Sequence, residues 1–270
     1  MTAAAVWSLV GSSSLVLGGL IAIRWDLAPR TIGLIMGFGA GVLIASLSVD
    51  LAVDAFERTN GLVTGLGLLT GGAVFYGGDL LLDRYGADKR KSSSGEQADG
   101  NPLAIVLGTI LDGIPESAAI GVALIEGEQM GVAFVLAVFI SNLPESLSAS
   151  SGLRRAGYSQ RWILGLWILV NVVCAFASLL AFGLLDDSHQ NAIAFTLAFA
   201  SGAILAMLAD TMMPVAFEHA GRMVALVTVV GFTLGFVLTE QQAESEGDAG
   251  AKAGSAVVAG LERGRPVLPG

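Results

Sequence analysis

Long apolar runs are the feature that most limits what this chain can fold into. Leu, Ala, Val, Ile and Gly dominate stretches of about twenty residues, the length of helix that crosses a hydrocarbon core roughly 30 Å thick. Hydrophobic residues make up 54% of the 270 residues and charged residues only 14%, and the mean hydropathy is +0.73. These runs predict an all-α polytopic membrane protein and exclude an ordinary soluble enzyme.

The apolar runs define eight expected transmembrane helices and two polar segments. The charged, Ser- and Gly-rich stretch 84–101 is expected to be a mobile loop, and the tail 241–270 is expected to be disordered. Residues 1–240 would then form one transporter-like membrane domain. The expected spans are 3–23, 31–56, 61–83, 102–125, 130–152, 161–185, 191–217 and 222–240.

The distribution of basic residues predicts the orientation. Ten of the 14 Lys and Arg residues fall in the first, third, fifth and seventh connections, and basic loops are retained on the cytoplasmic side. Both termini are therefore expected outside a cell (inner) membrane, with 84–101 in the cytoplasm. The net charge of −9 and the scattered basic residues argue against a nucleic-acid partner, so the lipid bilayer is the expected surrounding.

A weak internal repeat relates the second and seventh spans. Residues 37–57 and 198–218 align with a constant offset of 161 residues, and seven of the 21 positions are identical. Five crossings separate the two spans, so they run in opposite directions through the membrane. Spans one to three and six to eight would be inverted halves around a central pair, a 3+2+3 arrangement typical of secondary transporters.

The central pair, spans four and five, carries the most unusual residues. The strings LDGIPES (111–117) and ISNLPES (140–146) each place a proline before a glutamate in the middle of an apolar run. A proline inside a helix frees the carbonyl four residues earlier, and a freed carbonyl at that depth needs a partner. A cation is one such partner.

Helical spacing gathers polar groups on one face of each central helix. Asp112 and Glu116 are four residues apart, and Ser141 and Asn142 precede Glu145 by four and three. An ionised residue near the bilayer centre costs roughly 2.5 to 3.5 kcal/mol on insertion scales, so a bound cation is a better explanation than chance. The alternative is that these groups are hydrogen-bonded links between helices. The cation interpretation requires the three carboxylates to converge without internal donors filling the space among them.

Polar residues on other spans extend the expected site. Asn171 lies at the depth of the central pair, as a secondary ligand or an interhelical link. Asp210 falls toward the cytoplasm as an exit-side ligand or proton acceptor, and Asp50 and Asp54 toward the outside as a possible entrance. For Asp54, and likewise for Asp79 on the third span, a solvated helix end is the competing interpretation.

At these residues the chain resembles the ZIP (Zrt-, Irt-like protein) family of divalent metal transporters, in a divergent prokaryotic form. The resemblance covers nearly all of residues 1–240 and is most specific at the two Pro-Glu strings. The family pattern His-Asn-x-Pro-Glu-Gly falls on residues 112–117. The resemblance implies that a glutamate bridging two metals matches Asn171, and that a polar pair of span seven matches Asp210 and Thr211.

The departures from that pattern bear on the choice of metal. The family histidine is Asp112 here, its neighbouring asparagine is Gly113 and the bridging glutamate is Asn171. The remaining oxygen donors suit harder cations such as Mn²⁺, Mg²⁺ or Ca²⁺, although zinc also accepts carboxylates. The substrate is therefore expected to be zinc, manganese or iron, and the number of metal sites stays open.

Together these observations favour a non-enzymatic transporter that takes up divalent metal cations, with no organic cofactor. No nucleotide-binding motif is present in the sequence, so transport would draw on gradients. The alternatives are a proton-coupled transporter of another small solute and, with less support, a membrane-embedded enzyme. The glycine-rich helices allow close helix contacts, and a homodimer is one arrangement that they permit.

Overall fold

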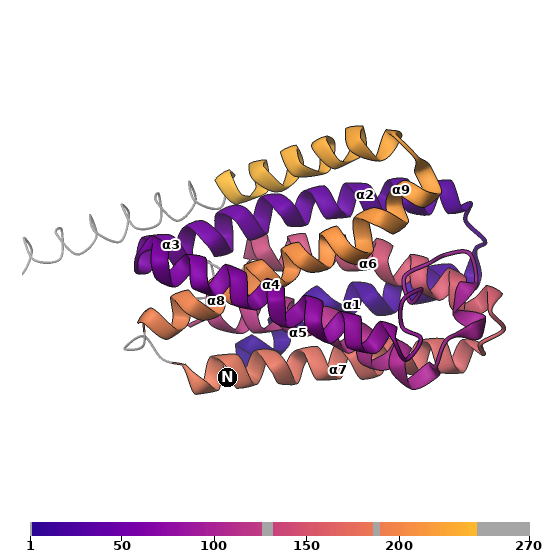
Figure 1. Ribbon diagram of the computed structural model, residues 1–270, viewed down its shortest axis with the longest axis horizontal. Coiled ribbons are helices and arrows are strands. Elements are labelled where there is room, and N and C mark those ends of the chain that lie inside the picture. The colour runs from indigo at the N-terminus through magenta and orange to yellow at the C-terminus, as the bar shows by residue number, and fades with distance from the viewer. Residues whose placement is uncertain (1, 126–131, 186–189, 242–270) are drawn as a thin grey trace, which may run out of the picture.

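The computed structural model describes residues 2–125, 132–185 and 190–241, and within them eight helices are long and apolar enough to cross a membrane (Figure 1). The described elements are helical throughout, which confirms the all-α expectation. The first span is α1 (Thr2–Arg24). The second is α2 (Pro29–Ser46) continued by the π-helix η1 (Leu47–Val53) and α3 (Asp54–Arg58), and the third is α4 (Gly61–Asp83), which is followed by the 3₁₀ turn η2 (Glu96–Asp99). The next three spans are α5 (Pro102–Ala123), α6 (Val132–Arg155) and α7 (Gln160–Leu184); the seventh is α8 (Gln190–Met207) continued by the π-helix η3 (Leu208–Met212) and α9 (Met213–Ala220), and the last is the helix Met223–Gln241.

The eight observed spans match the eight expected ones to within a few residues. Local chemistry explains several of the boundaries. The side chains of Asn60, Asn101 and Ser159 accept hydrogen bonds from backbone N–H groups in the first turns of α4, α5 and α7. Pro29 and Pro102 stand at the first positions of α2 and α5, where a missing N–H costs nothing. The expected disordered tail lies, from residue 242, outside the described residues.

The internal repeat has a structural counterpart in the two π-helices. η1 begins at Leu47 and η3 begins at Leu208, the two leucines that the offset of 161 residues aligns. A π-helical turn inside an α-helix is rare and is found mostly at functional sites. Its occurrence at the same aligned leucine in both spans supports a common origin for the two halves.

Close helix contacts repeat in the same symmetric way. On one side of the bundle a side chain on Gly41 would clash with the backbone at Thr228, and one on Gly231 with the backbone at Phe38. On the other side, Gly202 meets the backbone at Leu68, and Gly71 meets the backbone at Phe199. The second span therefore packs on the eighth as the seventh packs on the third, which is the relation that an inverted repeat requires.

The burial of the spans follows the same pairing. In an apolar stretch of 18 residues within each span, the buried share of residues is 44% and 39% for the first and sixth spans, 67% and 61% for the second and seventh, and 22% and 17% for the third and eighth. The least buried pair carries large exposed apolar side chains, such as Leu62 and Leu69 on α4, that suit a lipid environment. These regularities support the 3+2+3 arrangement, which stays a prediction.

Different segments of the chain lie at the two ends of the bundle. Figure 1 shows the N-terminus of α1 at one end and the connection 84–101 at the opposite end, together with the turns before α2 and α7. At that second end Arg154 and Arg155 both bind Asp26, at 2.7 and 3.0 Å. Asp26 is exposed, and the Arg155 guanidinium lowers the pKa of its carboxyl group.

Candidate functional site

Acidic side chains are buried in the middle of the bundle, on the two central helices. Asp112 and Glu116 on α5 are 3% and 2% exposed, and Glu145 on α6 is 4% exposed. Ser141 and Asn142, one turn before Glu145, are buried as well. Helical spacing therefore put these five side chains where the sequence predicted, on the inward faces of adjacent helices.

The three carboxylates lie close enough to act on one another. Glu116 is repelled by both Glu145 and Asp112 and interacts with the Asn142 amide, and Glu145 is repelled by Asp112. Gly39 of α2 fits against the kink region of α6, where a Cβ would stand 3.0 Å from Pro144 Cγ. α2 thus packs closely against the part of α6 that carries Ser141 and Glu145.

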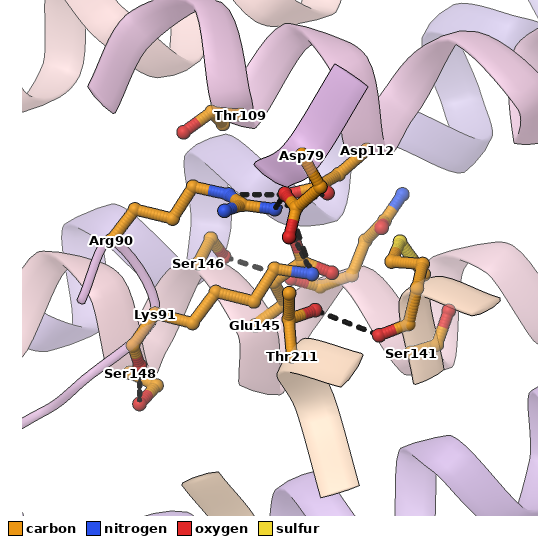
Figure 2. A network of polar contacts seen from close by, with 12 residues as sticks. Asp79, Arg90, Lys91, Thr109, Asp112, Ser141, Glu145, Ser146, Ser148 and Thr211 are labelled. Atoms are coloured by element: carbon orange, nitrogen blue, oxygen red, sulfur yellow. Dashed lines mark hydrogen bonds and ion pairs between the residues drawn. The ribbon is translucent and has the colours of Figure 1, made fainter. Parts of the chain in front are cut away.

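Two cations of the chain itself enter this acidic cluster. Figure 2 shows the side chains of Arg90 and Lys91, from the connection between α4 and α5, extending toward the carboxylates. Arg90 donates to both oxygens of Asp112, at 3.0 and 2.8 Å, and to Asp79 Oδ1 at 2.6 Å. The Lys91 ammonium lies 3.3 Å from Asp112 and 3.2 Å from Glu145. Internal donors therefore occupy part of the space that the cation interpretation needs to be free.

Burial and charge act in opposite directions on Arg90. The side chain is 2% exposed, and burial by itself lowers the pKa of a guanidinium group because it penalises the charged form. The adjacent carboxylates of Asp112 and Asp79 outweigh that effect and raise the pKa of Arg90. Arg90 is therefore a permanent positive charge inside the acidic cluster.

Residues 84–101, which we call the docked loop, are built into the end of the bundle. Ser148 on α6 donates to the Lys91 carbonyl oxygen at 2.6 Å, and the Gln97 amide donates to the Ser92 carbonyl oxygen at 2.5 Å. Arg155 donates to the Ser93 carbonyl oxygen at 2.9 Å. The expectation of a mobile loop was wrong. Although the loop is hydrophilic in composition, its four successive residues 90–93 are buried and pack between the helices.

Glycines on the central helices make room for the docked loop. A Cβ on Gly108 of α5 would stand 2.8 Å from Arg90 Cδ. A Cβ on Gly152 of α6 would overlap the Ser92 carbonyl oxygen and come within 2.5 Å of the Gln97 amide. Gly95, at φ +92°, turns the loop back along Arg155. These three positions fit the loop to the helices on both sides.

Asp79 was interpreted as a solvated helix end, and that interpretation was wrong. The residue is fully buried on α4, and its carboxylate binds Arg90 at 2.6 Å. The sequence signal was present, because Asp79 and Asp83 are four residues apart near the end of an apolar span. Only the path of the docked loop shows that this helix end is covered by protein.

Asn171, Asp54 and Asp50 each have a polar partner outside the central carboxylates. Asn171 on α7 accepts a hydrogen bond from Ser12 on α1, the interhelical contact that was its alternative interpretation. Asp54 binds Arg58 at 2.8 Å near the N-terminal end of the bundle. Asp50 accepts hydrogen bonds from Ser46 and Thr239. None of these contacts tests the proposed roles of the three residues.

Asp210 lies at the end of the bundle that carries the docked loop. It is exposed, interacts with Asp79, and lines a pocket of about 170 Å³ together with Thr211, Arg90 and Lys91. Asp88 and Glu218 also line this pocket. The pocket therefore joins the acidic cluster to the surface at the end of the bundle where the sequence placed Asp210.

Buried oxygen atoms in the cluster lack a hydrogen bond. Glu116 Oε1 and Asp79 Oδ2 have no hydrogen-bond partner, and the Lys91 ammonium lies at ion-pair distance from two carboxylates. Within the described ranges, no three His, Cys, Asp or Glu side chains are arranged to hold a metal ion. Arg90 and Lys91 thus offset part of the negative charge of the cluster, and among the described residues neither lies within ion-pair distance of Glu116.

Fold and site together define a multi-pass helical membrane protein with a charged polar centre. No family model matches the chain. The chain is 27% identical over 220 residues to an Arabidopsis thaliana protein named "Putative zinc transporter". The match covers 80% of this chain but 35% of the relative, so the chain spans about a third of the relative's length. This similarity supports the resemblance to ZIP-type transporters.

Proposed function

We propose that the chain transports a divalent metal cation across the membrane, by uptake, through the carboxylates between α5 and α6. The observation that carries the proposal is the burial of Asp112, Glu116 and Glu145 on two adjacent proline-containing helices of a membrane bundle. Isolated buried carboxylates are costly in such a setting, and a cation that binds them offsets that cost. The name of the plant relative points to the same substrate class.

The ligands that we propose for the cation are the three carboxylates, with Ser141 and Asn142 as secondary donors. Asn171 and Asp210 complete the set from α7 and from the loop end, and Asp50 and Asp54 form the entrance. All of these donors are oxygen atoms, which suits manganese or iron as well as zinc. The docked loop faces the cytoplasm in this proposal, because the first, third, fifth and seventh connections hold most of the basic residues.

Arg90 and Lys91 have to be reconciled with this proposal, since they contact two of the three carboxylates. Neither residue belongs to a membrane-spanning helix, and they precede the start of α5, Pro102, by twelve and eleven residues. Their side chains reach the cluster from the pocket that Asp210 lines. They therefore enter the acidic cluster from outside the spanning helices, unlike donors fixed on those helices themselves.

Uptake of metal by cells that express the chain tests the proposal. Accumulation of Zn²⁺ and Mn²⁺ is measured for the wild type and for Glu116→Gln and Glu145→Gln, with Glu57→Gln, an exposed glutamate, as the control. We expect both central variants to lose uptake of the transported ion and the control to retain it. Equal accumulation in all four strains, at equal amounts of protein in the membrane, would reject the site.

A further inference from the structure

The docked loop places two positive charges in the acidic cluster. The proposed substrate, a divalent cation, would bring the same charge to the same place. Arg90 and Lys91 are adjacent in sequence and both enter the acidic cluster. One divalent ion that replaced them would leave the net charge of the buried cluster unchanged. This equality matters because a change in the net charge of a poorly hydrated site is costly.

We propose that Arg90 and Lys91 are tethered counter-cations, which offset part of the charge of the substrate carboxylates in the empty carrier and leave when the metal ion binds. The inference rests on the proposed function and adds the occupant of the site in its empty state. The chain would thus exchange one occupant for another of equal charge.

The contacts of Lys91 indicate that it is held by charge and can be replaced. Its ammonium lies between Asp112 and Glu145 at 3.3 and 3.2 Å. These distances are longer than the 2.6 to 3.0 Å of the Arg90 hydrogen bonds, although Lys91 is only 3% exposed. An ammonium group in a fixed structural role would be expected to satisfy its donors when buried.

Glu116 supplies the first contact for the incoming ion. It is the one of the three central carboxylates with no recorded ion pair to Arg90 or Lys91 among the described residues, and its Oε1 has no hydrogen-bond partner. The Asn142 amide lies beside it. A cation bound first by Glu116 would then compete with Lys91 for Glu145, one turn of helix beyond Asn142.

The pocket lined by Asp210 can receive the displaced side chains of Arg90 and Lys91. Arg90 and Lys91 line the pocket of about 170 Å³ as well as the acidic cluster, and the acidic residues Asp88, Asp210 and Glu218 line the same pocket. The two cations can therefore withdraw toward solvent and keep anionic partners. Ser94 of the docked loop also contacts His219 of α9 at 3.2 Å, so withdrawal changes contacts with the seventh span as well as with α6.

Binding of Zn²⁺ and Mn²⁺ to the purified full-length protein tests the inference. Lys91→Met removes the charge and keeps the length of the side chain. Lys89→Met is the matched control, because the Lys89 side chain is 47% exposed and its ion pair with Glu96 is long, at 3.8 Å. Suppose that about nine-tenths of the wild-type molecules have Lys91 in the acidic cluster, so that about one-tenth can bind metal. The apparent affinity of the wild type for the metal is then about tenfold weaker than the intrinsic affinity. Lys91→Met removes this competition and is expected to bind metal about tenfold more tightly. Lys89→Met is expected to bind like the wild type.

Accessibility of the loop provides a second measurement that a purely structural role would not change. Ser93, fully buried, is replaced by cysteine in a Cys174→Ala background and labelled with a membrane-impermeant thiol reagent. We expect saturating metal to increase the labelling rate. Unchanged labelling together with unchanged affinity in Lys91→Met would overturn the inference. If the wild type neither binds nor transports either metal, the proposed function itself fails, and that outcome is distinct because it needs no variant.

Discussion

The pairing of Arg90 with two buried aspartates predicts a large and specific loss of stability when the arginine is removed. Arg90→Met leaves the carboxylates of Asp79 and Asp112 in the bundle without the donor that now lies 2.6 to 3.0 Å from them. Removing one partner of a buried ion pair costs about 3 to 5 kcal/mol, because the remaining charge is uncompensated. All three side chains are at most 3% exposed, so solvent screening reduces this cost little.

Thermal unfolding of the detergent-solubilised protein measures the effect. At about 2 to 4 °C per kcal/mol for a chain of this size, the expected decrease in Tm is roughly 6 to 20 °C. Arg84→Met, a change in an exposed arginine at the same end of the bundle, is the control and should shift Tm by only a degree or two. The comparison separates the ion pairs from a general effect of lost positive charge.

A double-mutant cycle decides whether the ion pairs are the cause. Asp79→Asn alone should also destabilise the protein, because it removes one partner of Arg90. Asp79→Asn combined with Arg90→Met should lose less than the sum of the two single changes, by about 1 to 3 kcal/mol, as expected for residues in direct contact. Strict additivity would refute the reasoning, since it would mean that Arg90 stabilises the fold through something other than its carboxylate partners.

Three further outcomes follow from the structure. Glu116→Gln should raise the Tm of the metal-free protein, since it removes a buried carboxylate that Glu145 and Asp112 repel; a lower Tm would count against that repulsion. Gly152→Leu should expose the docked loop to limited proteolysis while the helices stay folded, because its side chain would overlap Ser92; unchanged cleavage would contradict the docking. Gly71→Leu and Gly231→Leu should lower Tm by similar amounts, as the pseudo-symmetric contacts predict, and a large inequality would weaken the repeat.

Much of the fold could be predicted because each spanning helix carries its own signal. Twenty apolar residues in a row and a capping residue such as Asn60 or Asn101 define a helix without information from the rest of the chain. The repeat was also visible locally, because Leu47 and Leu208 fall at matched positions. The π-helical turns at those leucines could not be foreseen, since nothing in their composition distinguishes them from the α-helix on either side.

The docked loop could not be predicted because its burial depends on residues far away in the sequence. A stretch with the composition of 84–101 resembles a solvated linker, and its hydrogen-bond partners, Ser148 and Arg155, lie more than fifty residues further on. The one local signal is the position of two basic residues about ten residues before a span that contains an aspartate. That signal alone cannot distinguish a loop in solvent from a loop that enters the bundle.

The docked loop also gives a reason for the aspartate at position 112, where the ZIP pattern that the chain resembles has a histidine. Asp112 accepts two hydrogen bonds from Arg90 and lies 3.3 Å from Lys91, contacts that require an anionic acceptor with two oxygens. A neutral imidazole could accept one hydrogen bond at most and would leave both cations poorly compensated. In the proposed metal site, the same carboxylate would add a hard oxygen donor, which zinc prefers less than nitrogen or sulfur. Asp112 and the basic pair of the docked loop are therefore two parts of one electrostatic arrangement, and the metal preference of the proposed site should be interpreted from both together.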